Sequence, residues 1–514
     1  MTVDIIKPKV LIIGAGPAGL GAIEQFLSKG FDVVAFDARS SIGGLWADFD
    51  ATPPEAVVTF DEYGHAIVLS ENEHNGVLTP APTPMYAGVI ANTPRDVMTY
   101  RQRPYPPNTP FLPTYKQMKA YQERYAENYL PFIRHNRIVT RVRYTPPDHV
   151  PAPSSDGRTR KWLVEWTPTQ TSGLPDVGTT YEEQFDNIVV ANGSDSRPYV
   201  PYIAGLWDWK GQITHSRWYR RAEDFADKTV LVVGSGSSSA DIVRELGMTF
   251  VENRQAKPKK VYRSIRSQPR LDAQLEKGWK DFIHTIGSID QAWAPSDSSS
   301  AGRLRTVDGI ELDDVDVIIF ATSYVVRFEF LRQSDEPFAS HPLIHYPQPP
   351  AGSPRPPPEL VGKSTFDGGL RAHNLDGFQV FYLPDPTIAF LLLHAEAISW
   401  PFAELQAHAV AAYWSGSKAA ELVQHPDEGN EAHSVVVLGH PAEFDYATKL
   451  LALIGEGGPE EVTSDGKWGE WVHWRKRIRE FGHSKFSPVA AREEAQGVFR
   501  TPFIVSDEEL ATIT

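Results

Sequence analysis

The chain has 514 residues, no cysteine and a formal net charge of -15. Without cysteine it cannot form a disulfide, a cysteine-ligated metal site or a thiol nucleophile, and its negative charge disfavours nucleic acid and anionic membranes as partners. No apolar stretch approaches the roughly eighteen residues of a membrane span and the N-terminus lacks a signal pattern, so we expect a cytoplasmic protein of two or three domains with no membrane anchor.

The segment 9–37 predicts a complete βαβ unit. A short apolar run, 9–13, is typical of a buried strand. A glycine-rich turn at 14–19 follows it and opens a helix that ends near Gly30. A second apolar strand then runs over 31–36 and ends on Asp37.

This turn has the spacing of a dinucleotide-binding motif. Gly14 permits the tight turn, Gly16 allows close approach of a pyrophosphate, and Gly19 lets helix and strand pack closely. The positive helix N-terminus would face the phosphates, and Asp37 would accept hydrogen bonds from a ribose while repelling a 2′-phosphate. The alternative is a glycine-rich turn in an unrelated sheet protein. The cofactor-binding residues expected here are Gly14, Gly16, Pro17, Ala18, Gly19, Asp37 and Ala38.

Two loops that follow contain further candidates. Gly44, Leu45 and Trp46 could wall a flavin, or they could form a glycine turn beside a core tryptophan. Residues 51–85 show little periodicity and predict an irregular surface excursion. Asn92 then stands at the mouth of a loop, where a turn or capping residue is the alternative to an active-site amide.

The middle of the first half predicts a helix and then a small antiparallel insertion. An aromatic stripe over 115–125 has helical spacing and indicates core packing. Three short strand-like runs between 137 and 190 are separated by turn-rich segments. We include Val142, in the first of these runs, among the expected cofactor contacts.

A second nucleotide-binding unit is predicted over 229–266. An apolar strand, 229–233, leads into a glycine- and serine-rich turn, although Ser239 replaces the third glycine. Arg263 and Arg266 close the next strand, and guanidinium forks match the 2′-phosphate of NADPH; a solvated basic strand end is the alternative. The expected contacts are Gly234, Ser235, Gly236, Ser237, Ser238, Arg263 and Arg266.

The rest of the chain predicts two further strands, a proline-rich segment and a helix. An apolar strand lies near 317–324, the proline-rich segment 341–358 is interpreted as a stiff loop or an oligomer contact, and 386–406 predicts a last strand feeding a helix. The expected domains are an FAD-binding domain (1–205, first part), an NADPH-binding domain (206–330), and a return to the FAD domain with a C-terminal helical tail (331–514).

Taken together these motifs resemble the flavin-containing monooxygenases, the class B flavoproteins. The motifs G-A-G-P-A-G, G-G-L-W and G-S-G-S-S-S-A-D-I follow in that family's order, and the segment 209–219 resembles its fingerprint F-x-G-x-x-x-H-S-x-x-Y. The resemblance covers about residues 8–415. Trp209, Ser239 and Ser323 depart from the family pattern, the last where a glycine is usual.

The resemblance implies an α/β fold with two Rossmann-like domains, the NADPH domain being inserted in a discontinuous FAD domain. It implies an enzyme that uses FAD and NADPH to transfer one oxygen from a C4a-hydroperoxyflavin to a soft nitrogen or sulfur of a small molecule, N-oxide formation included. Asn92 would lie beside the flavin as the catalytic residue, and no metal is implied. His215, Ser216 and Tyr219 would couple NADPH binding to its position over the flavin, unless His215 is simply a buried linker residue.

Two other functions are compatible with the same pattern. A Baeyer–Villiger monooxygenase would act on ketones, but that branch usually carries Trp or Pro four residues after the fingerprint histidine, where this chain has Tyr219. A flavin- and NADPH-binding protein without turnover is the second alternative. The substrate, with molecular oxygen, and the homo-oligomeric state are left open.

Overall fold

The first sheet is formed by strands from both ends of the chain, in a computed structural model that describes residues 7–456, 475, 476, 479 and 480 except 50, 51, 53, 54, 87, 102, 108, 148–158, 170–172, 174, 175, 267–277, 298, 365 and 417–435. Its order is β20-β9-β1-β2-β5, with all neighbours parallel. The strands are β1 (Lys9–Ile13), β2 (Asp32–Phe36), β5 (Ile133–Arg134), β9 (Asn187–Val190) and β20 (Ile388–Phe390). Strand β20 therefore brings the chain back to the sheet that contains β1.

Alternate residues of these strands feed two separate cores. Val10 and Ile12 face α1 (Pro17–Ser28), α3 (Tyr115–Ala126) and α5 (Ser399–Trp414), which with α6 (Ala442–Leu453) contribute to one apolar cluster. Leu11 and Ile13 face the opposite cluster, which includes the antiparallel strands β6 (Arg137–Tyr144), β7 (Trp162–Pro168) and β8 (Tyr181–Phe185). Burial on both faces explains why the strands are continuously apolar.

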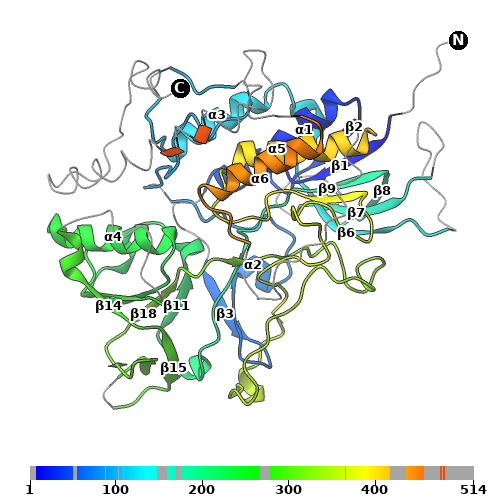
Figure 1. Cartoon of the computed structure of the whole chain (residues 1–514). Helices are drawn as coiled ribbons and strands as arrows, with labels where there is room; N and C mark the ends of the chain where they lie inside the picture. The colour runs from blue at the N-terminus through cyan, green and yellow to red at the C-terminus, as the bar shows by residue number, and fades with distance from the viewer. Residues whose placement is uncertain are drawn as a thin grey trace, which may run out of the picture.

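The second sheet has the order β11-β18-β12-β13-β14 and is also parallel. It contains β11 (Gln212–His215), β12 (Thr229–Val233), β13 (Lys260–Ser264), β14 (Ile283–Ile286) and β18 (Val317–Phe320). Helix α4 (Ser237–Val251) covers one face, and the antiparallel strands β15 (Ile289–Trp293), β16 (Arg303–Thr306) and β17 (Glu311–Leu312) lie on the other. Figure 1 shows this unit as a separate green lobe beside the first.

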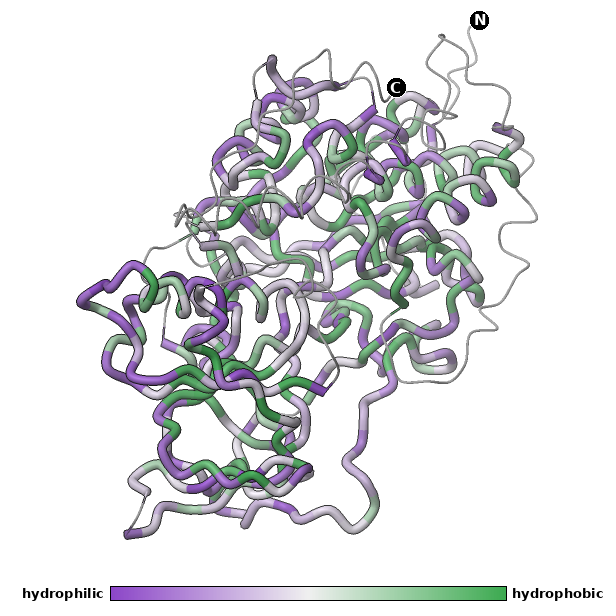
Figure 2. The backbone as a smooth tube through the Cα atoms, turned by 60° about the vertical axis from the view of Figure 1, so that its left-hand side comes forward, coloured by the Kyte–Doolittle hydropathy of each residue, from purple (hydrophilic) through white to green (hydrophobic). Residues whose placement is uncertain are grey.

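Two crossing segments join the lobes. They pair as the short antiparallel strands β10 (Arg197–Pro198) and β19 (Tyr324–Val325). The second sheet is therefore an insertion between two connections of the first domain, as the fold class requires. In Figure 2 the hydrophobic stretches run mainly through the interior of the molecule, and the hydrophilic stretches lie mainly in its outer turns.

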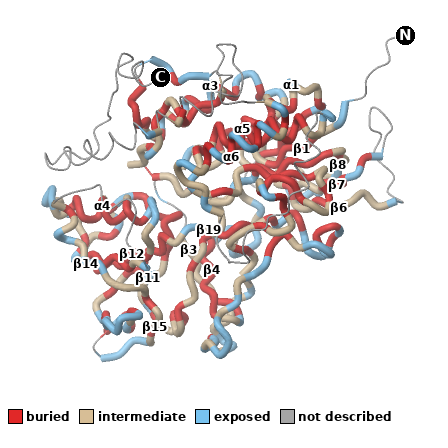
Figure 3. Tube along the Cα trace, viewed as in Figure 1, coloured by how far each residue is buried: buried red, intermediate tan, exposed pale blue. Residues whose placement is uncertain are grey.

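The expected irregular excursion over 51–85 is wrong. The structure has a hairpin there, β3 (Ala56–Phe60) and β4 (Ala66–Ser70), followed by the short helix α2 (Glu71–His74). All five residues of β4 are buried, and the hairpin shares a core with the second sheet, where Figure 3 places it between the lobes. Strand β4 has no alternation of polar and apolar residues that would show one solvent-facing side, because all five of its residues are buried.

Three further features bear on the predictions. The aromatic stripe on α3 is buried, which confirms its role in the core. None of the described helices is long and apolar enough to cross a membrane. Most of the expected C-terminal tail, including its tryptophans at 468, 471 and 474, lies outside the described residues.

Candidate active site

The first glycine turn has a geometry that only glycine can adopt at two positions. Gly14 has φ +106°, and a Cβ there would lie 2.5 Å from the Ala191 carbonyl oxygen. A Cβ on Gly19 would lie 1.8 Å from the Gly14 carbonyl oxygen. Pro17 begins α1, where its missing N–H costs nothing, and Ala18 is buried behind it. The turn therefore leads the strand directly into an open helix N-terminus.

The loop at 43–46 packs against this turn. The Gly43 N–H donates to the Ala15 carbonyl at 3.2 Å, and a Cβ on Gly44 would come within 3.0 Å of the Gly16 Cα. Leu45 and Trp46 continue as a short 3-10 helix, with the Trp46 ring 6.3 Å from Tyr115. Two backbones thus meet without side chains between them, a geometry that suits the close approach of a pyrophosphate.

Asp37 lies at the end of β2 beside the turn. Its carboxylate accepts the N–H groups of Ala15 at 2.6 Å and Arg39 at 2.7 Å. Burial raises the pKa of this carboxyl, although the two amide donors oppose the shift. Each carboxylate oxygen keeps a second lone pair for a ribose hydroxyl. Ala38 follows it, partly buried.

Val142 lies away from these groups, in the interior of β6. Its side chain is completely buried, and its N–H donates to the Phe330 carbonyl at 2.7 Å. The sheet of β6, β7 and β8, to which Val142 belongs, packs against the first parallel sheet. Its proposed cofactor contact stays a prediction.

The second glycine turn repeats the first with one change. Gly234 has φ +138°, and a Cβ there would meet the Ala321 carbonyl oxygen at 2.3 Å. Where the first turn has Gly19, the hydroxyl of Ser239 donates to the Gly234 carbonyl at 2.6 Å. Ser239 therefore fits by adding a hydrogen bond within the turn. Ser235 is partly exposed, and Gly236, Ser237 and Ser238 are exposed at the start of α4.

The register of the second sheet refines the position of the two arginines. Val233 pairs with Ser264 as Ile13 pairs with Phe36, so Ile265 occupies the place of Asp37. An apolar residue thus replaces the acid that would repel a 2′-phosphate. Arg266, the next residue, is exposed, whereas the side chain of Arg263 is 2% exposed inside β13. Of the two arginines, Arg266 is therefore the one that reaches the surface beside the second turn.

His215 ends β11 at the junction of the lobes. Burial lowers its pKa to about 3, so the ring is neutral. Its Nδ1 accepts the Arg217 N–H at 3.2 Å, and its Nε2–H donates to the Ser323 carbonyl at 3.0 Å. Ser216, also buried, places its hydroxyl 3.5 Å from Nδ1. The histidine thus ties β11 to the crossing segment after β18.

The backbone conformation at Ser323 is one that favours glycine. Its φ is +71°, a left-handed conformation that costs a non-glycine residue about 1 kcal/mol or more. Its carbonyl accepts the Tyr199 N–H at 3.1 Å as well as the His215 ring. The two crossing segments and β11 are therefore joined through one carbonyl oxygen.

The fingerprint also contains a packing constraint. A Cβ on Gly211 would lie 2.1 Å from the ring of Trp209, which rests directly on that glycine. In this chain the aromatic-x-glycine pattern is therefore a steric pair, because the outer ring of Trp209 occupies the space that a side chain at position 211 would need. Tyr219, in contrast, is buried in the core of the second domain, where its hydroxyl donates to Glu245 at 2.6 Å.

The loop of Asn92 connects the two lobes. Asn92 is exposed, and its Oδ1 accepts the Thr93 hydroxyl at 3.3 Å. Six residues earlier, the Tyr86 hydroxyl donates to Asp241 of α4 at 2.7 Å. Gly88 lies so close to α4 that a Cβ would be 2.4 Å from a Glu245 oxygen. This loop of the first lobe is thus held against α4, the helix that begins at the second glycine turn.

Sequence reasoning missed several of these contacts. Tyr86, Gly88 and Glu245 form the contact between loop and helix, and Thr83 donates to the Leu45 carbonyl at 2.5 Å beside the first turn. The lone glycine after Tyr86 was the only available signal. Within the described part of the chain, no group of three metal-ligating side chains is placed to hold an ion.

Comparison with known proteins agrees with this geometry. The flavin-binding monooxygenase-like family model matches residues 61–253, and an NAD(P)-binding Rossmann-like domain model matches 12–78. The two models and the relatives support FAD and NADPH as cofactors, and the two cradles fit them.

Two curated relatives cover most of the chain. Flavin-containing monooxygenase iboF of Amanita muscaria is 27% identical over 478 residues, 85% of this chain and 84% of the relative. The thiol-specific monooxygenase of Saccharomyces cerevisiae is 28% identical over 417 residues, 78% of this chain and 76% of the relative.

A solved structure shows the same fold. The S-allyl-L-cysteine S-oxygenase from Allium sativum superposes with a TM-score of 0.64 at 22% identity, covering 99% of this chain and 97% of that one. The motifs, the paired cradles, the family models and the relatives all support a flavin-containing monooxygenase family for this chain.

Proposed function

We propose that the chain is an FAD- and NADPH-dependent monooxygenase that places one oxygen atom on a soft nitrogen or sulfur of a small molecule. The observation that carries the proposal is the loop of Asn92, which leaves the first lobe and rests on α4 through Tyr86 and Gly88. The side chain assigned to the oxygen chemistry is thereby attached to both nucleotide-binding units at once.

The residues present suit the two cofactors differently. The first turn, with Asp37, fits an adenosine ribose without a 2′-phosphate, and the second, with Ile265 and Arg266, favours one that carries it. When bound, the flavin supplies oxygen activation and NADPH supplies the hydride. The protein supplies position and a dry environment.

Two observations support oxygen transfer over a thiol relay. The chain contains no cysteine, so it has no thiol to receive electrons. The yeast relative is named a thiol-specific monooxygenase and the Allium protein an S-oxygenase, which favours sulfur as the atom oxygenated.

Asn92 is proposed to hold a polar group in the active site and keep water from it. Its amide offers two donors and one acceptor oxygen on a loop that is held to α4 through Tyr86. His215, Ser216 and Tyr219 are positioning residues in this proposal. His215 and Ser216 fix the crossing segments, and Tyr219 fixes α4 through Glu245.

The test is an assay of the purified yellow protein with NADPH, oxygen and three substrate panels: thioethers, amines and ketones. We expect NADPH-dependent oxygen uptake and a product heavier by one oxygen atom with thioethers or amines. Esters formed from ketones would instead show a Baeyer–Villiger enzyme. Bound flavin without oxygen uptake on any panel would show a binding protein.

Asn92→Ala tests the catalytic assignment. Loss of the amide should uncouple the reaction, so that NADPH oxidation continues while hydrogen peroxide replaces most of the product, an effect we expect to be about tenfold or more. Asn128→Ala, at an exposed asparagine after α3, is the matched control. A product-to-NADPH ratio equal to that of the control would remove Asn92 from the mechanism.

A further inference from the structure

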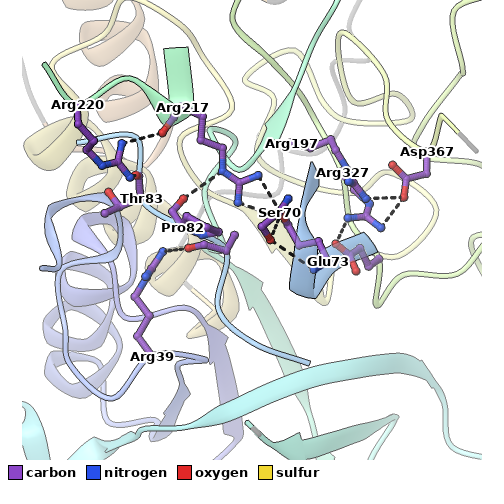
Figure 4. A network of polar contacts seen from close by, with 12 residues as sticks. Arg39, Ser70, Glu73, Pro82, Thr83, Arg197, Arg217, Arg220, Arg327 and Asp367 are labelled. Atoms are coloured by element: carbon purple, nitrogen blue, oxygen red, sulfur yellow. Dashed lines mark hydrogen bonds and ion pairs between the residues drawn. The ribbon is translucent and has the colours of Figure 1, made fainter. Parts of the chain in front are cut away.

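Three arginines gather where the two crossing segments meet. Arg197 lies in β10, Arg327 lies two residues after β19, and Arg217 follows His215 at the end of β11. We call these three residues the linker arginine cluster. Their side chains are 12%, 20% and 0% exposed, respectively. Figure 4 shows the guanidinium groups of Arg197 and Arg327 side by side near Asp367.

Three carboxylates form ion pairs with the cluster. Arg217 pairs with Glu73 of α2 at 3.2 Å and donates to the Pro82 carbonyl at 3.1 Å. Asp367 pairs with both Arg197, at 3.1 Å, and Arg327. Arg327 also pairs with Glu329, whose side chain is 64% exposed. Asp367 is therefore the one carboxylate paired with Arg197 among the described residues, and it is shared with Arg327.

Arg197 is left with unused donors. Its Nη2 bonds Asp367, whereas its Nε and Nη1 are buried with no hydrogen-bond partner among the described residues. Burial lowers the pKa of Arg217 and of Arg327, and the positive charge of Arg197 lowers both further. A buried site with unpaired guanidinium donors favours an anion that can accept hydrogen bonds from them.

The surroundings place this site next to the first cradle. Arg220 donates to the carbonyls of Arg217 and Thr83, at 3.0 and 3.1 Å. Arg39, two residues after Asp37, donates to the Ala81 carbonyl at 2.6 Å. The segment 81–83 thus lies between the cluster and the loop of Leu45, to which Thr83 is bonded.

We propose that the linker arginine cluster binds an oxyanion, a carboxylate or a phosphate, of a small-molecule ligand, with Arg197 as the principal donor. The planar fork of a guanidinium matches two oxygens of such a group. The inference rests on the proposed function only for the ligand's source: a carboxylate on the oxygenated substrate or a phosphate on the coenzyme.

The first experiment needs no turnover. Thermal unfolding of the flavin-loaded protein is measured with inorganic phosphate or acetate, at an ionic strength held constant with chloride. We expect a saturable stabilisation by these oxyanions that is lost in Arg197→Met. Arg303→Met is the matched control, because Arg303 forms an exposed pair with Glu311 on β16 and β17. Arg197→Lys keeps the charge but lacks Nε and the fork, and it carries the test if the methionine variant does not fold.

The second experiment identifies the source. S-methyl-L-cysteine is compared with 2-(methylthio)ethylamine, which lacks the carboxylate, and binding of NADP+ is compared with that of NAD+. A rise in KM of about tenfold or more for the acid alone in Arg197→Met assigns a substrate carboxylate, and a matching loss of NADP+ affinity alone assigns a coenzyme phosphate.

The outcomes separate the two proposals. Equal oxyanion stabilisation in wild type, Arg197→Met and Arg303→Met, or none in any of them, would overturn the oxyanion site even if thioethers are oxygenated. Saturable stabilisation that depends on Arg197, in a protein that oxidises neither thioether nor amine, would leave the site standing and overturn the proposed function.

Discussion

The Glu404 carboxyl lies in the contact between α1 and α5, where a titrating group is costly to ionise. Its side chain is 1% exposed. It accepts the Arg101 N–H at 2.8 Å and lies 3.4 Å from the Gln25 amide. Burial raises the pKa of Glu404 to about 8, although the Arg101 N–H opposes the shift. We expect Glu404→Gln to remove a pH dependence of stability.

The sign and size follow from linkage. Below the ordinary glutamate pKa of about 4.5 both states are protonated, and the stabilising effect is fully present. Between that value and about 8 the folded state holds a proton that the unfolded state has released. The free energy of unfolding therefore falls by about 1.4 kcal/mol for each pH unit in this window. From pH 5 to pH 7.5 the contribution lost is about 3 kcal/mol.

The assay is urea unfolding followed by tryptophan fluorescence at several pH values, for wild type, Glu404→Gln and the control Glu62→Gln at an exposed glutamate. The amide keeps an acceptor oxygen for the Arg101 N–H and cannot ionise. The stability difference between Glu404→Gln and wild type should grow in favour of the variant as pH rises. A difference that is constant from pH 5 to pH 8 would refute the reasoning.

Three further predictions concern the cradles and their junction. Gly19→Ala should abolish flavin retention, because its Cβ would lie 1.8 Å from the Gly14 carbonyl oxygen. In the control Gly236→Ala the new Cβ meets nothing within 4 Å, so this variant should fold normally. The measurement is the flavin absorbance of the purified proteins. Arg266→Ala should lower the preference for NADPH over NADH by about tenfold, measured as a ratio of kcat/KM values, and an unchanged ratio would contradict its role. Ser323→Gly should raise the free energy of unfolding by about 0.5–1 kcal/mol by relieving φ +71°; a lower unfolding midpoint would contradict this.

The sequence by itself determined the two βαβ units, because their signals are local. Gly14 and Gly234 adopt left-handed backbone, and the strand-turn-helix order around each is encoded within a few residues. The limits of β1 and β12 agree with the predicted runs 9–13 and 229–233. Asp37 could be identified because it directly ends such a strand.

Only the tertiary structure decided the strand register and which distant segments lie next to one another. Ile265, rather than an arginine, proved equivalent to Asp37 because strand register depends on pairing with β12. Strand β4 is buried along its whole length and shows no polar–apolar alternation in sequence. Arg197, Arg217 and Arg327 come from three separate segments and lie near one another only where the crossing segments meet. Burial and charge accumulate from segments far apart in the chain, and no local sequence window contains them.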